Sequence, residues 1–120
     1  MHPQFSVNGR GGTITNSEGG VNEKGTHDKP ARWVDYSGTV EGVTEGLTIF
    51  STAENDYPHR WLVRDYGTFG PRRVDAKSGK LFTLDSGKSI KQHVGILVHS
   101  GDVDAGHVKK RYQQYIDGKL

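Results

Sequence analysis

The sequence predicts a mainly β protein: an antiparallel β-sandwich, such as a jelly roll, with one C-terminal α-helix. Short segments of alternating polar and apolar residues recur between glycine-rich turns through the first 100 residues, as in antiparallel sheets. The chain has 17 glycines and only 32% hydrophobic residues, which favours a loop-rich β fold. Apolar residues spaced by three and four occur only near the end, and they predict a helix over residues 103–117. We therefore expect one domain, residues 1–120, with the helix packed on the sandwich.

The best-defined element is a hairpin near the middle of the chain. Residues 31–38 (Ala-Arg-Trp-Val-Asp-Tyr-Ser-Gly) are echoed by residues 60–67 (Arg-Trp-Leu-Val-Arg-Asp-Tyr-Gly). Between the echoes, Glu41-Gly42 predicts a two-residue turn, because glycine at the second turn position suits a positive φ. In the second echo, parity places the arginines on one side of the strand and Trp61 on the other.

The flanking elements follow from shorter patterns. Residues 4–8 alternate and predict a short strand, and residues 16–30 are polar and glycine-rich, which predicts a long surface loop. Residues 88–100 form the clearest strand pattern. Four apolar residues of this segment lie at even positions and are expected to face a core: Ile90, Val94, Ile96 and Val98. His99 is expected on the other face. Asp102 or Asp104 is expected to cap the final helix.

Composition excludes several classes of protein. The formal charge is +2, and the 16 basic and 14 acidic residues are interspersed, whereas a nucleic-acid binder usually concentrates its basic residues on one face. The chain has no cysteine, so disulfides and thiolate metal sites are excluded. No apolar run is long enough to span a membrane and no targeting segment is visible, so we expect a soluble chain of unknown compartment.

Histidine spacing does not predict a metal site. His93 and His99 share a strand face, but six residues at ~3.3 Å each separate them by roughly 20 Å. No His-x-His or His-x-x-x-His spacing occurs among the six histidines. We therefore expect no metal and no cofactor. A metal-dependent oxidative enzyme remains an alternative, with His27, His59 or His93 as ligands.

Carboxylates and aromatic residues in the central region are the candidate functional groups. Asp35, Asp65 and Glu45 are the candidate acid/base residues, because burial or a neighbouring carboxylate can raise one pKa and create an acid/base pair; Glu54 and Asp56 lie close by in sequence. Candidate substrate contacts are the flat rings and guanidinium groups of the echoes: Arg32, Trp33, Tyr36, Arg60, Arg64 and Tyr66. In the alternative interpretation, the tryptophans fill the core and Arg64 pairs structurally with Asp35 or Asp65.

Several of these segments, in this order and spacing, resemble the C-terminal part of the bacterial PmoA-like family, also catalogued as DUF6807. They are residues 11–19, 31–38, 60–67 and 82–101, and the closing helix with Tyr112 and Tyr115. The resemblance covers nearly all of the chain from Gly11 onward, but only the later part of the family's usual domain. Leu62 stands where the family often has a histidine, and Gly70-Pro71-Arg72-Arg73 replaces a longer family loop, so a site that used that histidine would be altered here.

The resemblance implies a large β-sandwich of the kind seen in sugar mutarotases, and a role in carbohydrate degradation. We therefore expect a carbohydrate-active protein that binds a carbohydrate ligand, with glycoside hydrolysis as the expected reaction. A non-catalytic carbohydrate-binding module is the alternative. Because half a sandwich exposes a sheet face and strand edges, we also expect a homo-oligomer, most simply a homodimer.

Overall fold

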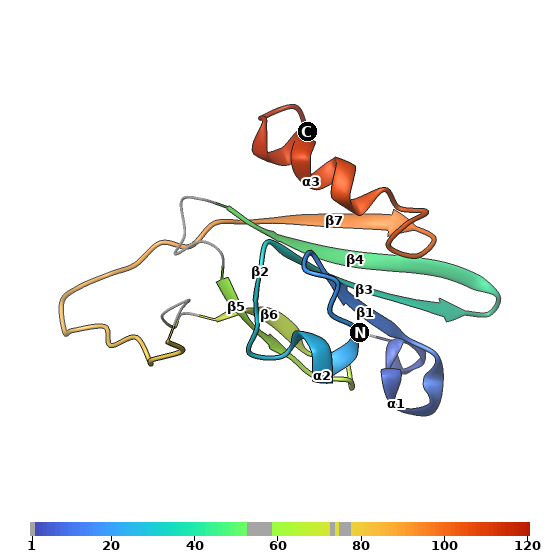
Figure 1. The fold of residues 1–120 in the computed structure, drawn as a ribbon, viewed down its shortest axis with the longest axis horizontal. Coiled ribbons are helices and arrows are strands. Elements are labelled where there is room, and N and C mark those ends of the chain that lie inside the picture. The colour runs from blue at the N-terminus through green and yellow to red at the C-terminus, as the bar shows by residue number, and fades with distance from the viewer. Residues whose placement is uncertain (1, 53–58, 73, 75–77) are drawn as a thin grey trace.

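The structure is a computed structural model that describes residues 2–52, 59–72, 74 and 78–120 (Figure 1). Its elements in chain order are η1 (Pro3–Phe5), α1 (Val7–Arg10), β1 (Thr13–Asn16), α2 (Asn22–Thr26), β2 (Pro30–Ala31), β3 (Trp33–Val40), β4 (Val43–Ser51), β5 (His59–Val63), β6 (Phe69–Arg72), β7 (Val94–Ser100) and α3 (Val108–Ile116). None of the described helices is long and apolar enough to cross a membrane.

Two antiparallel sheets form the body of the molecule. The larger has the strand order β1-β3-β4-β7 and the smaller has the order β2-β5-β6. The predicted mainly β fold with a C-terminal helix is therefore confirmed. The predicted hairpin is also confirmed: β3 and β4 pair from Trp33↔Phe50 to Val40↔Val43. Glu41 (φ 51°) and Gly42 (φ 80°) form the turn, which has the two positive φ angles of a tight hairpin.

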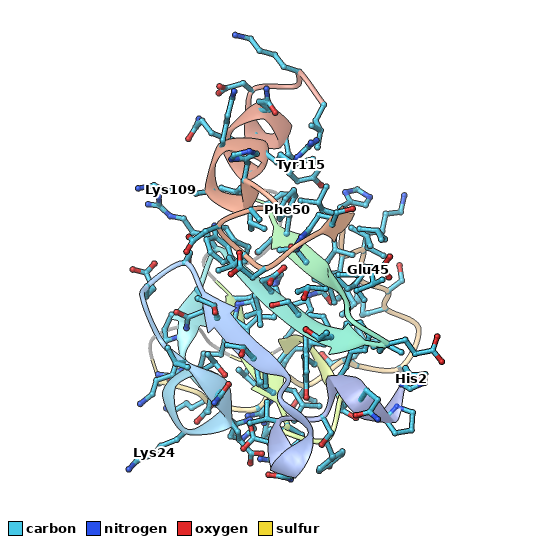
Figure 2. The ribbon with its side chains drawn as sticks, turned by 90° about the vertical axis from the view of Figure 1, so that its right-hand side faces the viewer. His2, Lys24, Glu45, Phe50, Lys109 and Tyr115 are labelled. Carbon is cyan, nitrogen blue, oxygen red and sulfur yellow. The ribbon has the colours of Figure 1, made fainter. Side chains whose placement is uncertain are left out.

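The two faces of the larger sheet carry separate cores. Between the sheets lies a cluster of fully buried residues: Ile14, Ala31, Val34, Tyr36, Trp61 and Val63. On the opposite face α3 packs on the sheet through Val108 and Tyr112, against Trp33 and Phe50. The rings of Phe50 and Tyr115 also lie close together, with their centroids 5.4 Å apart (Figure 2). Both tryptophans thus fill cores, as the alternative interpretation of the echoes predicted.

The N-terminal predictions need two corrections. Residues 4–8 are not a strand: the segment contains η1 and begins α1, and Pro3, with a fixed φ and no N–H to offer a ladder, starts the first helical turn. Residues 16–30 are not one open loop, because they contain α2 and β2. Asn16 and Thr26 are buried there, and the Asn16 side-chain oxygen accepts hydrogen bonds from the N–H groups of Glu18 (3.0 Å) and Gly20 (2.8 Å). Polar side chains organise this segment by bonding to its backbone.

The strand predicted at 88–100 is shorter than expected, and its apolar face is open. Strand β7 begins at Val94, and the side chains of Val94, Ile96 and Val98 are 40%, 66% and 75% exposed. Ile90, which precedes the strand, is also exposed. The smaller sheet has three strands and the larger has four, so the smaller sheet does not cover β7. The core between the sheets accordingly contains no residue of β7. The prediction that this face meets a core is therefore wrong.

The final helix begins later than predicted. It starts at Val108, and its N-cap position is His107, whose φ is 51°. Asp102 caps the turn that precedes the helix, since its Oδ1 accepts hydrogen bonds from the N–H groups of Asp104 (3.1 Å) and Ala105 (2.9 Å). Residues 101–107 therefore form an ordered loop between β7 and α3, and this loop lies over one of the histidines.

Candidate functional site

Three neighbouring strands bring a carboxyl group, a hydroxyl group and an imidazole together. Asp35 on β3 lies opposite Thr48 on β4, and the Thr48 hydroxyl donates a 2.6 Å hydrogen bond to Asp35 Oδ1. The same carboxylate oxygen lies 2.6 Å from Nε2 of His99 on β7. The cluster lies on the face of the larger sheet that carries α3, and Asp35 and His99 are 0% and 8% exposed.

Two glycines make room for the imidazole. Gly46 is the β4 residue opposite His99, and a Cβ added there would lie 2.3 Å from the ring. On the other side, a Cβ at Gly106 would lie 2.3 Å from His99 Nδ1. Glycine in a strand often marks such a close approach. The absent side chain at Gly46 lets His99 cross β4 and reach Asp35, and the loop of residues 101–107 closes over the ring.

The environment of Asp35 opposes ionisation. Burial raises the pKa of its carboxyl group, although hydrogen bonds from Thr48 and His99 act in the other direction. Asp35 Oδ2 is buried and has no hydrogen-bond partner in the described part of the chain. Both ring nitrogens of His99 face acceptors, since Nδ1 lies 3.3 Å from the Ser100 carbonyl oxygen. A ring protonated on both nitrogens satisfies these contacts, and so does a neutral ring that accepts the Asp35 proton at Nε2.

The raised pKa of Asp35 predicts how stability depends on pH. In the unfolded chain the group ionises near pH 4, whereas in the folded protein it ionises at higher pH. Its contribution to stability is therefore fully present below about pH 4 and is lost as the pH rises through the folded pKa. Relative to Asp35→Asn, the wild type should become progressively less stable over that window. Urea unfolding of both proteins from pH 3 to 8 measures the difference, and a difference that does not vary with pH would contradict the assignment.

The structure does not bring the three predicted acid/base residues together. Glu45 is exposed and lies on the opposite face of β4 from Thr48, because the two positions differ in parity. Asp65 lies in the turn after β5, where its Oδ1 accepts a hydrogen bond from the Glu23 N–H (2.9 Å) and the Glu23 carboxylate accepts one from the Asp65 N–H (3.0 Å). Glu54 and Asp56 lie outside the described residues. Asp35 is therefore the one predicted acid/base residue found in the cluster.

The predicted substrate contacts divide between cores and surface. Trp33 and Tyr36 are buried, and the Tyr36 hydroxyl donates to the Asp65 carbonyl oxygen (2.8 Å), so neither ring offers a face to a sugar. Arg32 is exposed, and Tyr66 is 66% exposed on the turn after β5.

The two arginines of the second echo contact residues of the segment 23–28. Arg64 forms a 2.8 Å ion pair with Glu23, so its predicted pairing with Asp35 or Asp65 is wrong. Arg60 donates to the Asp28 carbonyl oxygen (2.7 Å). The predicted separation of the arginines from Trp61 is nevertheless confirmed, since both arginines are half-buried while Trp61 is fully buried.

The other histidines are held by separate partners. His27 Nδ1 accepts a hydrogen bond from the Val63 N–H (3.2 Å), and His59 Nδ1 lies 2.7 Å from the Ser51 hydroxyl. His93 is exposed. Among the residues that the structure describes, no three potential ligands of the His, Cys, Asp and Glu types form a group that could hold a metal ion.

Comparison of the sequence with protein families decides its classification. Residues 3–113 match a family of unknown function, DUF6807. The chain belongs to this family. The family description carries neither an activity nor the PmoA-like label. No curated protein and no solved structure matches the sequence.

In this DUF6807 chain, His99 is not among the candidate site residues predicted from the sequence. Parity places it on the face expected to point away from a core, and its spacing from other histidines bears only on metal binding. The available signal was Gly46, a glycine inside a strand, which indicates close approach of another group. Because Asp35 and His99 are 64 residues apart, their contact depends on the strand order β3-β4-β7 and could not be read from spacing.

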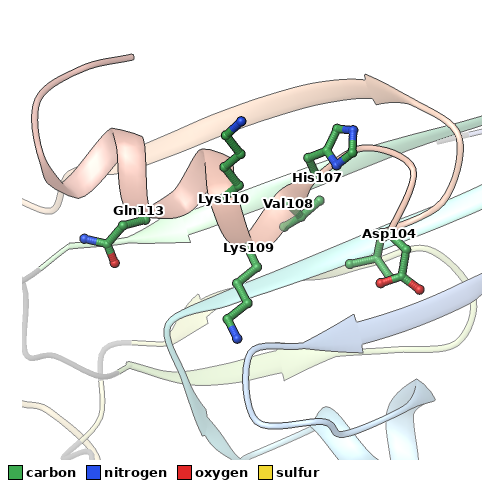
Figure 3. A pocket seen from close by; sticks show the side chains of 7 residues that line it. Asp104, His107, Val108, Lys109, Lys110 and Gln113 are labelled. Atoms are coloured by element: carbon green, nitrogen blue, oxygen red, sulfur yellow. The ribbon is translucent and has the colours of Figure 1, made fainter.

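A pocket of about 580 Å³ adjoins the loop that covers His99 in the DUF6807 structure (Figure 3). Its lining combines two valines with charged and polar residues. The lining residues are Val103, Asp104, His107, Val108, Lys109, Lys110 and Gln113. Three of these residues, Val103, Asp104 and His107, belong to the loop whose Gly106 lies against the His99 ring.

Proposed function

We propose that this DUF6807 protein is a carbohydrate-active enzyme in which Asp35 and His99 form the acid/base pair. The observation that supports the proposal is the buried carboxyl group of Asp35, whose Oδ1 lies 2.6 Å from an imidazole and whose Oδ2 has no hydrogen-bond partner among the described residues. Buried titratable groups with perturbed pKa values are concentrated at functional sites. The carbohydrate substrate class comes from the family resemblance seen in the sequence.

The pair is suited to act as one proton-transfer unit. The ring protonated on both nitrogens would give its Nδ1 proton to the leaving oxygen, while its Nε2–H stays hydrogen-bonded to the Asp35 carboxylate. The neutral ring would then take a proton back at Nδ1 from the attacking water molecule or from a sugar hydroxyl. Glycoside hydrolysis by two separate carboxylates is a poorer match, because Glu45 and Asp65 lie away from Asp35.

Access to the pair is the structural requirement of this proposal. Gly106 lies against His99 Nδ1, so the loop of residues 101–107 must turn aside before a substrate reaches the ring. The pocket beside the loop would then hold the rest of the sugar. His107, Lys109 and Lys110 line that pocket and offer hydrogen-bond donors to sugar hydroxyls.

Substitution of the pair should abolish turnover. In a screen of aryl glycosides, reducing sugars and sugar esters, Asp35→Asn and His99→Gln are expected to lower kcat by about 10²–10⁴-fold, the usual contribution of general acid/base catalysis. Glu45→Gln is the matched control, and it should retain wild-type turnover because its side chain lies on the other sheet face. If both pair variants are folded by circular dichroism and keep full kcat on a substrate of the wild type, the proposed pair is wrong.

One observation favours a second candidate, a non-catalytic carbohydrate-binding module. The pair is covered in the structure, whereas the aromatic ring of Tyr66 is 66% exposed on the turn after β5. A sugar that stacked on this ring would bind without meeting Asp35. In that case Tyr66→Ala would abolish binding to a glycan array, and Asp35→Asn would leave binding unchanged.

A further inference from the structure

The outer edge of β7 carries unused backbone hydrogen-bonding groups. The Gly101 N–H donates to the Thr44 carbonyl oxygen (2.7 Å), so the residues of β7 that bond to β4 are those at odd positions. The N–H and C=O groups of Val94, Ile96 and Val98 therefore point outward. Strand β7 is the last strand of its sheet, and no backbone hydrogen bond from the described residues reaches these three positions.

The side chains on this edge form an apolar surface. Val94, Ile96 and Val98 share one face of the sheet and are 40%, 66% and 75% exposed. Beside them, Leu47 and Ile49 of β4 line an open groove of about 480 Å³ that also includes Val98. An uncharged, exposed edge strand with an apolar face is a template for pairing with another strand.

We propose that a second copy of this chain pairs with β7, edge to edge and antiparallel, to join two four-stranded sheets into one. A two-fold axis at Ile96 would place Ile96 opposite its counterpart and Val94 opposite Val98 of the other copy, so that each of these three side chains gains an apolar neighbour. The outward N–H and C=O groups of the three residues would bond to those of the other copy.

The charges that flank β7 favour a second copy in this orientation. Lys88 and Lys91 precede the strand, and Asp102 and Asp104 follow it, all four exposed. Antiparallel pairing brings the basic flank of one copy to the acidic flank of the other, whereas parallel pairing would oppose like charges. Helix α3 packs on Phe50 over one face of the sheet (Figure 2), whereas the exposed side chains of Val94, Ile96 and Val98 lie on the other face.

Sedimentation equilibrium of the full chain at micromolar concentrations tests the proposal. The wild type is expected to be a dimer. Val98→Lys adds a charge to the apolar edge, and Ile96→Pro removes one outward N–H without touching the bonds to β4; both should be monomeric. Val21→Lys changes another exposed valine, which is 53% exposed and lies outside β7, and it should remain dimeric. A monomeric wild type, or a Val98→Lys variant that stays dimeric, would overturn the proposal.

Charge reversal tests the antiparallel arrangement, and hydrogen exchange tests the edge without any substitution. Lys88 lies opposite Asp104 of the other copy in this register, so Lys88→Glu should weaken the dimer roughly tenfold at low salt, because a symmetric dimer carries two copies of each contact. Adding Asp104→Lys should restore it. In the wild type, exchange of the Val94, Ile96 and Val98 amides should slow as protein concentration rises. Concentration-independent exchange at all three amides would show that β7 is not the interface.

Discussion

Replacing His99 by leucine is expected to lower the free energy of unfolding by about 3 kcal/mol, the upper end of the cost of leaving a buried polar group without its hydrogen-bond partner. The residue is 8% exposed and lies 2.6 Å from Asp35 Oδ1. Leucine has nearly the volume of histidine, so the loss arises from the polar contact more than from a cavity. Because Asp35 Oδ2 already has no partner in the described part of the chain, the substitution would leave the carboxyl group with Thr48 as its main support. Urea unfolding at pH 7 measures the change.

The neighbouring position provides the control for His99→Leu. Ser100 is exposed on the same strand, and Ser100→Ala should change stability by no more than about 0.5 kcal/mol. A double-mutant cycle with Asp35→Asn then isolates the coupling between the two residues. If the effects of Asp35→Asn and His99→Leu simply add, the two side chains do not interact as the structure indicates.

Replacing Trp61 by alanine is expected to cost about 3–5 kcal/mol, the range for a large aromatic residue removed from a core. Trp61 is fully buried between the two sheets. Its Nε1–H donates a 2.9 Å hydrogen bond to the Ala31 carbonyl oxygen, so the substitution creates a cavity and also removes a donor from a buried carbonyl group. The loss should appear as a lower midpoint in both thermal and urea unfolding.

Two variants separate the contributions of Trp61. Trp61→Phe keeps most of the apolar volume and removes the indole N–H, so it should cost clearly less than Trp61→Ala. Tyr66→Ala removes an aromatic side chain from the same echo, but this ring is 66% exposed, and the expected change is within about 0.5 kcal/mol. An equal loss in Trp61→Ala and Tyr66→Ala would contradict the burial assigned to these rings.

The two proposals concern different parts of the larger sheet. The acid/base pair lies on the face that carries α3, whereas the dimer would form along the β7 edge and extend the opposite apolar face. The strand that carries His99 also carries the exposed Ile96 and Val98. Pairing of this strand with a second copy would hold His99 more firmly in place, so the stability and turnover assays are best made at a fixed protein concentration.

The sequence pattern was sufficient to predict the features that depend only on residues close together in the chain. Glu41-Gly42 specifies a hairpin turn because glycine tolerates a positive φ. Alternation along 60–63 separates Trp61 from the arginine face because successive strand side chains point to opposite sides. The C-terminal helix could also be predicted, because the spacing of apolar residues differs between a helix and a strand.

Packing decided the features that depend on which surfaces meet. Alternation showed that Val94, Ile96 and Val98 share a face, but the three-stranded layer leaves that face open, and sequence period carries no information about the width of the opposing sheet. The same is true of the candidate site. Asp35 and His99 are in contact because β4 lies between their strands and Gly46 lacks the side chain that would keep them apart. Contacts between distant segments are set by strand order and by the space between backbones, and both are properties of the assembled fold.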